Sequence, residues 1–258
     1  MKLSYLQQGF GSNFPLVLLH PYPLNAHFWK NQLSGISRQR HVIAPNFRGY
    51  GATPADAGDH FSVEMFASDV RKTLHNLKIP KAVFAGCSLG GYVLFELWRQ
   101  DPDLIAGMAF IDTRAEADTE EGRAKRMDSI QKIRETGNAM IPDVAAGLLS
   151  ETTRKARPDV EREVKSWAAK PDCDTLIKSI ELLAKRPDSQ ATLPTIDVPT
   201  LVVVGEEDTV TPVSSAEIIA NGVENGSLVK IPEAGHLSPL ENPLAVNQAL
   251  SEFLPTIS

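Results

Sequence analysis

Short apolar runs alternate with segments of helical periodicity along most of the chain. Apolar runs predict strands at residues 2–7, 16–19, 42–44, 82–85, 105–111, 201–204 and 228–231. Between them, regularly spaced apolar residues predict helices at 26–33, 63–77, 88–100, 214–221 and 240–254. Nearly continuous apolar strands that alternate with helices are typical of a parallel sheet with helices on both faces. We therefore expect an α/β fold of seven or eight strands, and predict a mostly parallel eight-stranded sheet.

The alternation stops once, between residues 113 and 192. This segment contains no strand-like run, and its apolar residues recur at helical spacing. Four groups of them, around Ile130, Leu148, Val164 and Ile180, predict four helices. We interpret residues 113–192 as a helical cap inserted into an α/β core of residues 1–112 and 193–258. A shorter glycine-containing stretch, Gly9 to Phe14, is interpreted as a hairpin turn.

The hexapeptide Gly86-Cys87-Ser88-Leu89-Gly90-Gly91 lies where a predicted strand meets a predicted helix. A GxSxG sequence in that context is typical of a nucleophile elbow. A serine at such a sharp turn projects its hydroxyl away from the sheet, and the turn needs neighbours without bulky side chains. The alternative is an ordinary glycine-rich turn between strand and helix, or one that cradles a phosphate.

A serine hydroxyl is a poor nucleophile at neutral pH, so it needs a base and a carboxylate that orients the base. Asp208 follows the strand at 201–204, and His236 follows the strand at 228–231. The order Ser88, Asp208, His236 is the order expected for this strand–turn–helix motif. Taken singly, Asp208 could be a helix cap and His236 a loop histidine. Asp112, at the end of the strand at 105–111, is the rival acid.

Acyl transfer also needs N–H donors for the oxyanion that develops on the substrate. The backbone N–H of Leu89, the residue after the serine, is the first candidate. The second is expected from the loop after the strand at 16–19, which reads His20-Pro21-Tyr22-Pro23. Proline has no backbone N–H, so Tyr22 is the candidate donor between the two prolines.

Composition limits the partners of the chain. Its 258 residues carry a net charge of −6 and no basic run, which argues against nucleic acid and leaves a small molecule as the expected partner. The N-terminal sequence has no signal-peptide pattern and no apolar stretch reaches membrane-spanning length, so we expect a cytoplasmic protein with no membrane partner. The two cysteines, Cys87 and Cys173, lack metal-ligand spacing, and no dinucleotide fingerprint is present, so neither a metal nor a cofactor is expected.

Five segments carry a resemblance to a known family: HPYPLNAHFW (20–29), APNFRGYGAT (44–53), GCSLGGY (86–92), GEEDTVTP (205–212) and EAGHLSPLENP (233–243). Over nearly its whole length the chain resembles serine hydrolases of the α/β-hydrolase superfamily. Within it, the chain is similar to small capped bacterial hydrolases that include carboxylesterases, 3-oxoadipate enol-lactonases and cofactor-free haloperoxidase-like perhydrolases. The resemblance implies a triad of Ser88, Asp208 and His236, with Tyr22 and Leu89 at the oxyanion hole. Many members have His-Gly where this chain has His20-Pro21, and Asp where it has Asn46.

These observations predict a hydrolase that cleaves a carboxylic ester or lactone of small to medium size through an acyl-enzyme on Ser88. Candidate residues of the substrate pocket are His27, Trp29, Met127, Trp167 and Leu237. One alternative is an enol-lactonase-like enzyme for an anionic lactone, which would need a cation in the pocket; the candidates are Arg114, Arg123, Arg126, Lys132 and Arg134. The alternative of another class is a ligand-binding receptor that keeps the fold with little turnover.

Overall fold

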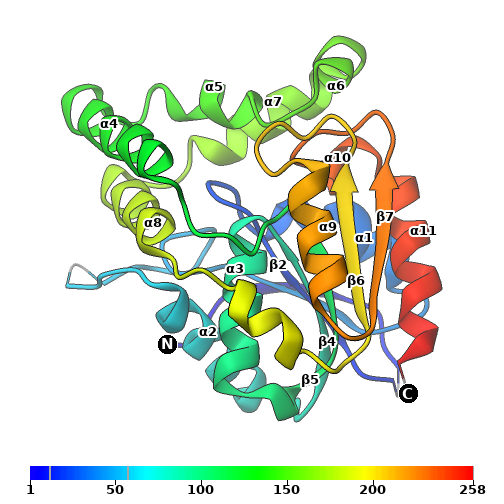
Figure 1. Cartoon of the computed structure of the whole chain (residues 1–258). Coiled ribbons are helices and arrows are strands. Elements are labelled where there is room, and N and C mark those ends of the chain that lie inside the picture. The colour runs from blue at the N-terminus through cyan, green and yellow to red at the C-terminus, as the bar shows by residue number, and fades with distance from the viewer. Residues whose placement is uncertain (12, 57, 258) are drawn as a thin grey trace.

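The computed structural model describes residues 1–11, 13–56 and 58–257 and contains one sheet of seven strands (Figure 1). In chain order the strands are β1 (Tyr5–Gln8), β2 (Leu16–Leu19), β3 (Val42–Pro45), β4 (Ala82–Cys87), β5 (Ile105–Ile111), β6 (Thr200–Gly205) and β7 (Gly226–Ile231). Their order across the sheet is β1-β3-β2-β4-β5-β6-β7. Only β1 pairs antiparallel, so the predicted mostly parallel sheet is confirmed.

The central strands are buried on both faces, which explains their uninterrupted apolar sequences. Alternate side chains of a strand point to opposite faces. In β2, Leu16 and Leu18 join one hydrophobic cluster, whereas Val17 and Leu19 join the other. Each cluster continues into the helices on its own side of the sheet, so the sheet has a separate core on each face.

Helices cover both of these faces. On one side lie α1 (Lys30–Ile36), preceded by a 3-10 turn at Ala26–Trp29, and α11 (Pro243–Phe253); on the other lie α2 (Val63–Asn76), α3 (Leu89–Gln100) and α9 (Val213–Gly222). Figure 1 shows α9 and α11 on opposite sides of β6 and β7. A short helix, α10 (Ser238–Glu241), joins β7 to α11. This arrangement leaves the carboxyl ends of the parallel strands at one edge, where ligand sites of such sheets form.

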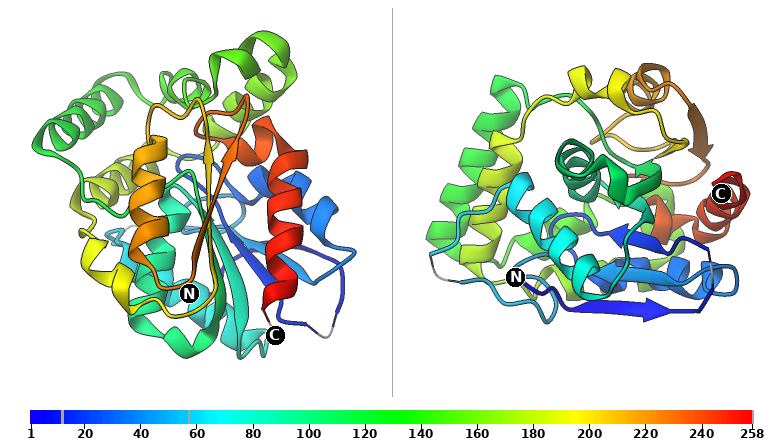
Figure 2. Two further views of the ribbon diagram at one scale, coloured as in Figure 1. Left: turned by 45° about the vertical axis from the view of Figure 1, so that its right-hand side comes forward. Right: turned by 90° about the horizontal axis from the view of Figure 1, so that it is seen from below.

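The segment between β5 and β6 folds as helices, as its apolar spacing predicts. They are α4 (Glu120–Thr136), α5 (Ile141–Ala146), α6 (Glu151–Ala156), α7 (Pro158–Ala168) and α8 (Cys173–Lys185). In Figure 1, α5, α6 and α7 lie above the carboxyl ends of β6 and β7, and α4 and α8 lie on the left; the left panel of Figure 2 shows the same helices from another side. There are five helices within the described part of this segment, not the predicted four, because the group around Leu148 lies in the turn between two short helices. The division of the chain into core and cap stays a prediction.

Two details of the sheet differ from the predictions. The sheet has seven strands over the described residues rather than eight. Each of the seven apolar runs forms one strand, and no other described segment forms hydrogen bonds with the edge of the sheet as an eighth. The stretch from Gly9 to Phe14 does not connect hairpin partners: β1 pairs with β3, which lies between β1 and β2. Residue 12 within that stretch lies outside the described residues. Strand pairing is a long-range choice that the local turn sequence does not determine.

Candidate functional site

Ser88 occupies a sharp turn between β4 and α3. Its backbone has φ 50° and ψ −112°, a conformation that non-glycine residues rarely adopt. The turn is possible because the flanking residues are glycines. A Cβ on Gly86 would lie 2.4 Å from the carbonyl oxygen of Gly90, and a Cβ on Gly90 would lie 2.1 Å from that of Leu19. The sequence around Ser88 therefore folds as the expected elbow.

A continuous series of hydrogen bonds links Ser88 to His236 and Asp208, and we call these three residues the Ser88 chain. His236 Nε2 lies 2.9 Å from Ser88 Oγ, and His236 Nδ1 lies 2.8 Å from Asp208 Oδ2. Asp208 lies in the loop between β6 and α9, and His236 lies in the loop between β7 and α10. The side chains of His236 and Asp208 are buried. The fold thus brings together the three residues that the sequence placed at strand ends.

The partners of Asp208 determine how the imidazole is protonated. The Thr211 hydroxyl donates to Asp208 Oδ2 at 2.7 Å, and the backbone N–H groups of Val210 and Thr211 donate to Oδ1. A carboxylate only accepts, so Nδ1 of His236 carries the proton that faces Asp208. With that proton on Nδ1, the neutral imidazole has its free lone pair on Nε2. His236 is therefore oriented to accept the hydroxyl proton of Ser88.

The charges around His236, like its hydrogen bonds, favour proton transfer from Ser88 to the imidazole. Burial alone would lower the pKa of His236, but the negative charge of Asp208 and its hydrogen bond outweigh burial and raise that pKa above its usual value. Burial would likewise raise the pKa of Asp208, but His236 and Thr211 hold it below its usual range. The pair therefore stabilises a positive charge on the imidazole, the state that follows proton transfer from serine.

Two backbone N–H groups that the sequence offers as oxyanion donors have no acceptor among the described residues: that of Leu89, which follows Ser88 and begins α3, and that of Tyr22, in the loop after β2. The Tyr22 loop is held by His20, whose Nε2 accepts from the N–H of Phe47 at 3.0 Å and whose Nδ1 donates to the carbonyl of Pro21. Burial lowers the pKa of His20 to about 4, so its ring is neutral at pH 7. The loop is thus fixed by a histidine that takes no part in the Ser88 chain.

Asp112, the rival acid, makes different contacts. It is fully buried at the end of β5 with φ 44°, and its carboxylate accepts the backbone N–H groups of Gly205 at 3.0 Å and Ser238 at 2.9 Å. Burial and the charge of Asp208 raise its pKa. Asp112 therefore ties the end of β6 to the start of α10, and it makes no hydrogen bond to His236 in the part of the chain that is described.

Glu241 is a further buried carboxylate, which sequence reasoning missed. It accepts the backbone N–H groups of Gly235 and Leu237 at 3.0 Å each, and that of Ser150 at 2.8 Å. The first two flank His236, and the third belongs to the loop between α5 and α6. Glu241 thus fixes the histidine loop against the inserted helices. In the sequence, Glu241 is recognisable only by its position five residues after His236. That spacing does not predict a structural role until the fold is known.

We expect Glu241→Ala to lower the free energy of unfolding by about 3 kcal/mol or more, because it leaves three buried N–H groups without an acceptor. Chemical denaturation monitored by circular dichroism measures this change. Glu241→Gln is the matched variant: it keeps one carbonyl acceptor and should lose distinctly less stability. Equal losses in the two variants would contradict a role for the carboxylate.

The predicted pocket residues differ in exposure. Trp29 and Leu237 are fully buried, whereas Met127 is 46% exposed on α4. His27 is exposed, and its ring lies 6.5 Å from that of Trp167 in a stacked arrangement. Roles for these side chains at the substrate stay predictions.

The cations proposed for an anionic substrate separate into two groups. Arg114 and Arg126 line a cavity together with Thr211, whereas Arg123, Lys132 and Arg134 are exposed and do not line it. Arg186 lines the same cavity and was not among the candidates, because its place in the fold depends on how α8 ends against the loop that follows β5.

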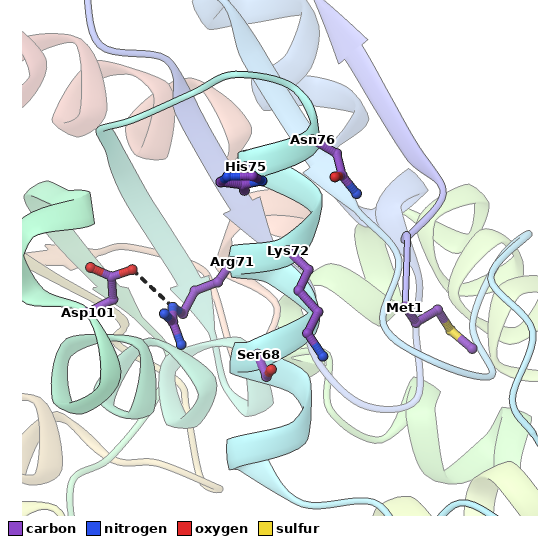
Figure 3. Close-up of a pocket in the computed structure, with 7 residues that line it drawn as sticks. All are labelled: Met1, Ser68, Arg71, Lys72, His75, Asn76 and Asp101. Atoms are coloured by element: carbon purple, nitrogen blue, oxygen red, sulfur yellow. Dashed lines mark hydrogen bonds and ion pairs between the residues drawn. The ribbon is translucent and has the colours of Figure 1, made fainter.

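A larger surface cleft, of about 510 Å³, lies along α2 (Figure 3). There Arg71 and Lys72 project from the helix, and Arg71 pairs with Asp101 at 3.0 Å. No residue of the Ser88 chain lines this cleft. Within the described part of the chain, no group of three histidine, cysteine or acidic side chains is arranged to hold a metal ion, and no helix is long and apolar enough to cross a membrane.

Comparison with known proteins agrees with this architecture. The α/β hydrolase fold family matches residues 15–243. The match covers most of the chain, including β2 to β7 and the three residues of the hydrogen-bonded chain. The chain belongs to the α/β hydrolase fold family, as the resemblance in the sequence indicated.

Several relatives are similar over nearly their whole length. A 3-oxoadipate enol-lactonase of Acinetobacter baylyi is 26% identical over 263 residues, covering 98% of this chain and 93% of the relative. A protein of Pseudomonas syringae that carries the name carbamate hydrolase RutD is 26% identical over 234 residues, covering 90% of each chain. Among solved structures, a thermophilic esterase of Thermogutta terrifontis, with malate bound, is 32% identical with a TM-score of 0.93, covering 98% of this chain and 93% of that one.

Proposed function

We propose that this chain is a serine hydrolase that cleaves a carboxylic ester or lactone through an acyl-enzyme on Ser88. One observation carries the proposal: Ser88, His236 and Asp208 form a continuous hydrogen-bonded chain, with Nε2 of His236 2.9 Å from the hydroxyl oxygen of Ser88. Membership of a hydrolase family supports the broader assignment as a hydrolase. The roles given to the individual residues below belong to the proposal.

In the first half of the reaction, Ser88 Oγ attacks the carbonyl carbon of the substrate while His236 Nε2 accepts the hydroxyl proton. Asp208 stabilises the imidazolium that results and keeps its Nδ1 proton in place. The carbonyl oxygen becomes an oxyanion, which accepts the N–H groups of Leu89 and Tyr22. Each such donor contributes about two to three orders of magnitude in rate. Collapse of the intermediate expels the alcohol, which takes the proton from His236.

In the second half, water replaces the alcohol. His236 accepts a proton from this water, which attacks the acyl carbon, and the second intermediate collapses to release the acid and restore the Ser88 hydroxyl. In a lactone, the alcohol and the acid belong to one molecule, so acylation opens the ring and the product leaves only after hydrolysis. The same groups therefore suffice for an ester and for a lactone.

The inserted helices lead us to propose a small or medium substrate rather than a polymer. Ser88 follows the carboxyl end of β4, and α5, α6 and α7 lie above the carboxyl ends of β6 and β7 in Figure 1. We assign the inserted helices the role of a cap over the pocket. Relatives named as an esterase, an enol-lactonase and a carbamate hydrolase support a small carbonyl substrate. Fold alone does not select among these bonds.

Labelling with a fluorophosphonate tests the assignment of Ser88. We expect one adduct per chain, which peptide mass spectrometry should place on Ser88, together with loss of activity toward a panel of short esters, lactones and carbamates. Cys87→Ser is a useful control, because the adjacent thiol is buried, burial raises its pKa, and this variant should label as fully as the wild type. An adduct elsewhere, or none, would refute the serine-hydrolase proposal.

The same experiment separates the enzyme from a receptor on this fold. A receptor would form the adduct on Ser88 but would not turn over any member of the panel. We expect turnover of at least one ester or lactone, with loss of activity in proportion to labelling.

A further inference from the structure

The backbone of His236 is held by the inserted helices. Its N–H donates to the carbonyl oxygen of Leu148 at 3.0 Å. Leu148 lies in the connection of residues 147–150 between α5 and α6, which we call the α5–α6 turn. His236 itself lies in the loop between β7 and α10, and a loop residue depends for its position on bonds of this kind. The position of the imidazole therefore depends on the α5–α6 turn.

Glu241 strengthens this link on both sides of His236. Its Oε1 accepts the N–H groups of Gly235 and Leu237, and its Oε2 accepts that of Ser150, in the α5–α6 turn, at 2.8 Å. The carboxylate is buried, so these bonds are shielded from water, and bonds to a carboxylate are stronger than bonds between neutral groups. One side chain thus joins the two residues that flank His236 to the turn that accepts its N–H.

The α5–α6 turn and the loop of His236 also touch directly, at a glycine. A Cβ on Gly235 would lie 2.7 Å from the backbone nitrogen of Ser150 and 3.1 Å from the carbonyl oxygen of Leu148. Contacts this short leave no room for a methyl group in a closely packed interior. Any side chain at position 235 would therefore push the loop and the turn apart.

The other two members of the Ser88 chain are held by the sheet. The backbone N–H of Ser88 donates to the carbonyl oxygen of Ile111, the last residue of β5, at 3.0 Å. The backbone N–H of Asp208 donates to that of Gly205, the last residue of β6, at 3.1 Å. A movement of the α5–α6 turn would therefore shift His236 relative to both of its partners. A displacement of about 1 Å can lower the rate of a catalysed step about a hundredfold.

We propose that the α5–α6 turn positions His236 for proton transfer, and that Glu241 transmits the position of the turn to the loop of the base. This proposal rests on the function proposed for Ser88 and His236. It gives the inserted helices a role in catalysis besides covering a pocket: the base is in place only while the turn is packed on its loop. Glu241 and Leu148 are positioning residues, because they act through His236.

Gly235→Ala tests the contact without changing a charge or deleting a hydrogen-bonding group. For the ester or lactone with the highest turnover, we expect kcat to fall about tenfold to hundredfold while KM changes less than about threefold, because the imidazole moves and the substrate contacts stay. Gly122→Ala, on α4 of the inserted segment, is the matched control. Its Cβ would lie 3.4 Å from Thr119 Oγ1, an ordinary contact, and kcat should stay within about twofold of the wild type.

The titration of His236, followed by nuclear magnetic resonance, gives a readout that needs no turnover. Burial lowers the pKa of His236, and the negative charges of Asp208 and Asp112 raise it by more. The positive charge of Arg114 acts in the same direction as burial. Moving the imidazole away from Asp208 should therefore lower the pKa in Gly235→Ala and weaken the low-field resonance of the Nδ1 proton. The control variant should titrate as the wild type does.

Glu241→Gln tests the same link from its other side, and it keeps the proposal testable if Gly235→Ala does not fold. The amide oxygen can still accept the N–H groups of residues 235 and 237, but the NH2 group would face the N–H of Ser150. We expect kcat to fall again with little change in KM. The double variant should lose little more than the worse single variant, because both changes loosen one contact.

Three results would overturn the proposal. The first is equal kcat and equal titration of His236 in Gly235→Ala and Gly122→Ala. The second is a loss in Gly235→Ala that appears in KM alone, and the third is full additivity in the double variant. Failure of the proposed function is distinguishable, since the wild type would then show neither turnover nor labelling of Ser88, whereas the change in the titration of His236 would remain.

Discussion

Replacing Ser88 by alanine is expected to lower kcat by about five to six orders of magnitude, the loss typical of removing the nucleophile from a serine triad. The expected loss is this large because, in the proposed mechanism, His236 and Asp208 act through the serine hydroxyl: without it no acyl-enzyme forms, and His236 has no hydroxyl proton to accept from residue 88. Stopped assays over hours, on the ester with the highest turnover, measure the residual rate. The free energy of unfolding should change little, since the substitution removes one hydroxyl.

Ser238→Ala provides the matched control for this loss. Ser238 is a buried serine two residues beyond His236, and its hydroxyl has no hydrogen-bond partner among the described residues. Removing that hydroxyl should leave kcat within about threefold of the wild type, because the hydroxyl has no hydrogen bond to lose and the backbone N–H of Ser238 still donates to Asp112. If Ser88→Ala retained as much activity as Ser238→Ala, another residue would be the nucleophile.

The fold and the three residues of the Ser88 chain could be predicted because each depends on a local signal. Apolar runs and turn residues locate the strands, and the carboxyl ends of parallel strands meet at one edge of the sheet. Ser88, Asp208 and His236 follow β4, β6 and β7 at that edge, and the loops after these strands bring the three side chains together although β5 lies between β4 and β6. Glycines at 86 and 90 identify the elbow, since any side chain there would strike the backbone.

Other features could not be predicted because they depend on contacts between distant parts of the chain. Glu241 acquires its role only when Ser150 and the histidine loop approach it, and Arg186 only when α8 ends beside Asp118. The sequence left Asp112 open as the acid, because strand-end position alone fits it as well as Asp208. The choice between them depends on side-chain direction, which is set by the backbone at residues 112 and 208.

Asp208→Asn is expected to lower kcat by about four orders of magnitude, a loss typical of this change in a serine triad. Asparagine would place either a weaker acceptor or an N–H group opposite Nδ1. In the second case the imidazole would carry its proton on Nε2, where it could not accept one from Ser88. Steady-state kinetics at a pH where the wild type is fully active measures this loss.

The parallel variant Asp112→Asn separates the two carboxylates. Asp112 accepts two backbone N–H groups, and asparagine can accept only one of them while turning an N–H toward the other. We therefore expect a loss of about 1–3 kcal/mol in the free energy of unfolding, with a much smaller loss of kcat than in Asp208→Asn. The reverse result, a collapse of kcat in Asp112→Asn with Asp208→Asn nearly intact, would make Asp112 the acid.

The pH dependence of kcat/KM gives this comparison a second readout. His236 acts as a base only when neutral, so activity falls as the pH drops through its pKa, which Asp208 and Asp112 both raise. Removing the negative charge of Asp112 lowers that pKa, so the acidic limb of the profile should move to lower pH. The move is limited, because burial and the charge of Asp208 raise the pKa of Asp112 itself and so weaken its negative charge as the pH falls. A purely structural role for Asp112 would lower the whole profile without moving the limb, whereas a move to higher pH would contradict the charge interaction.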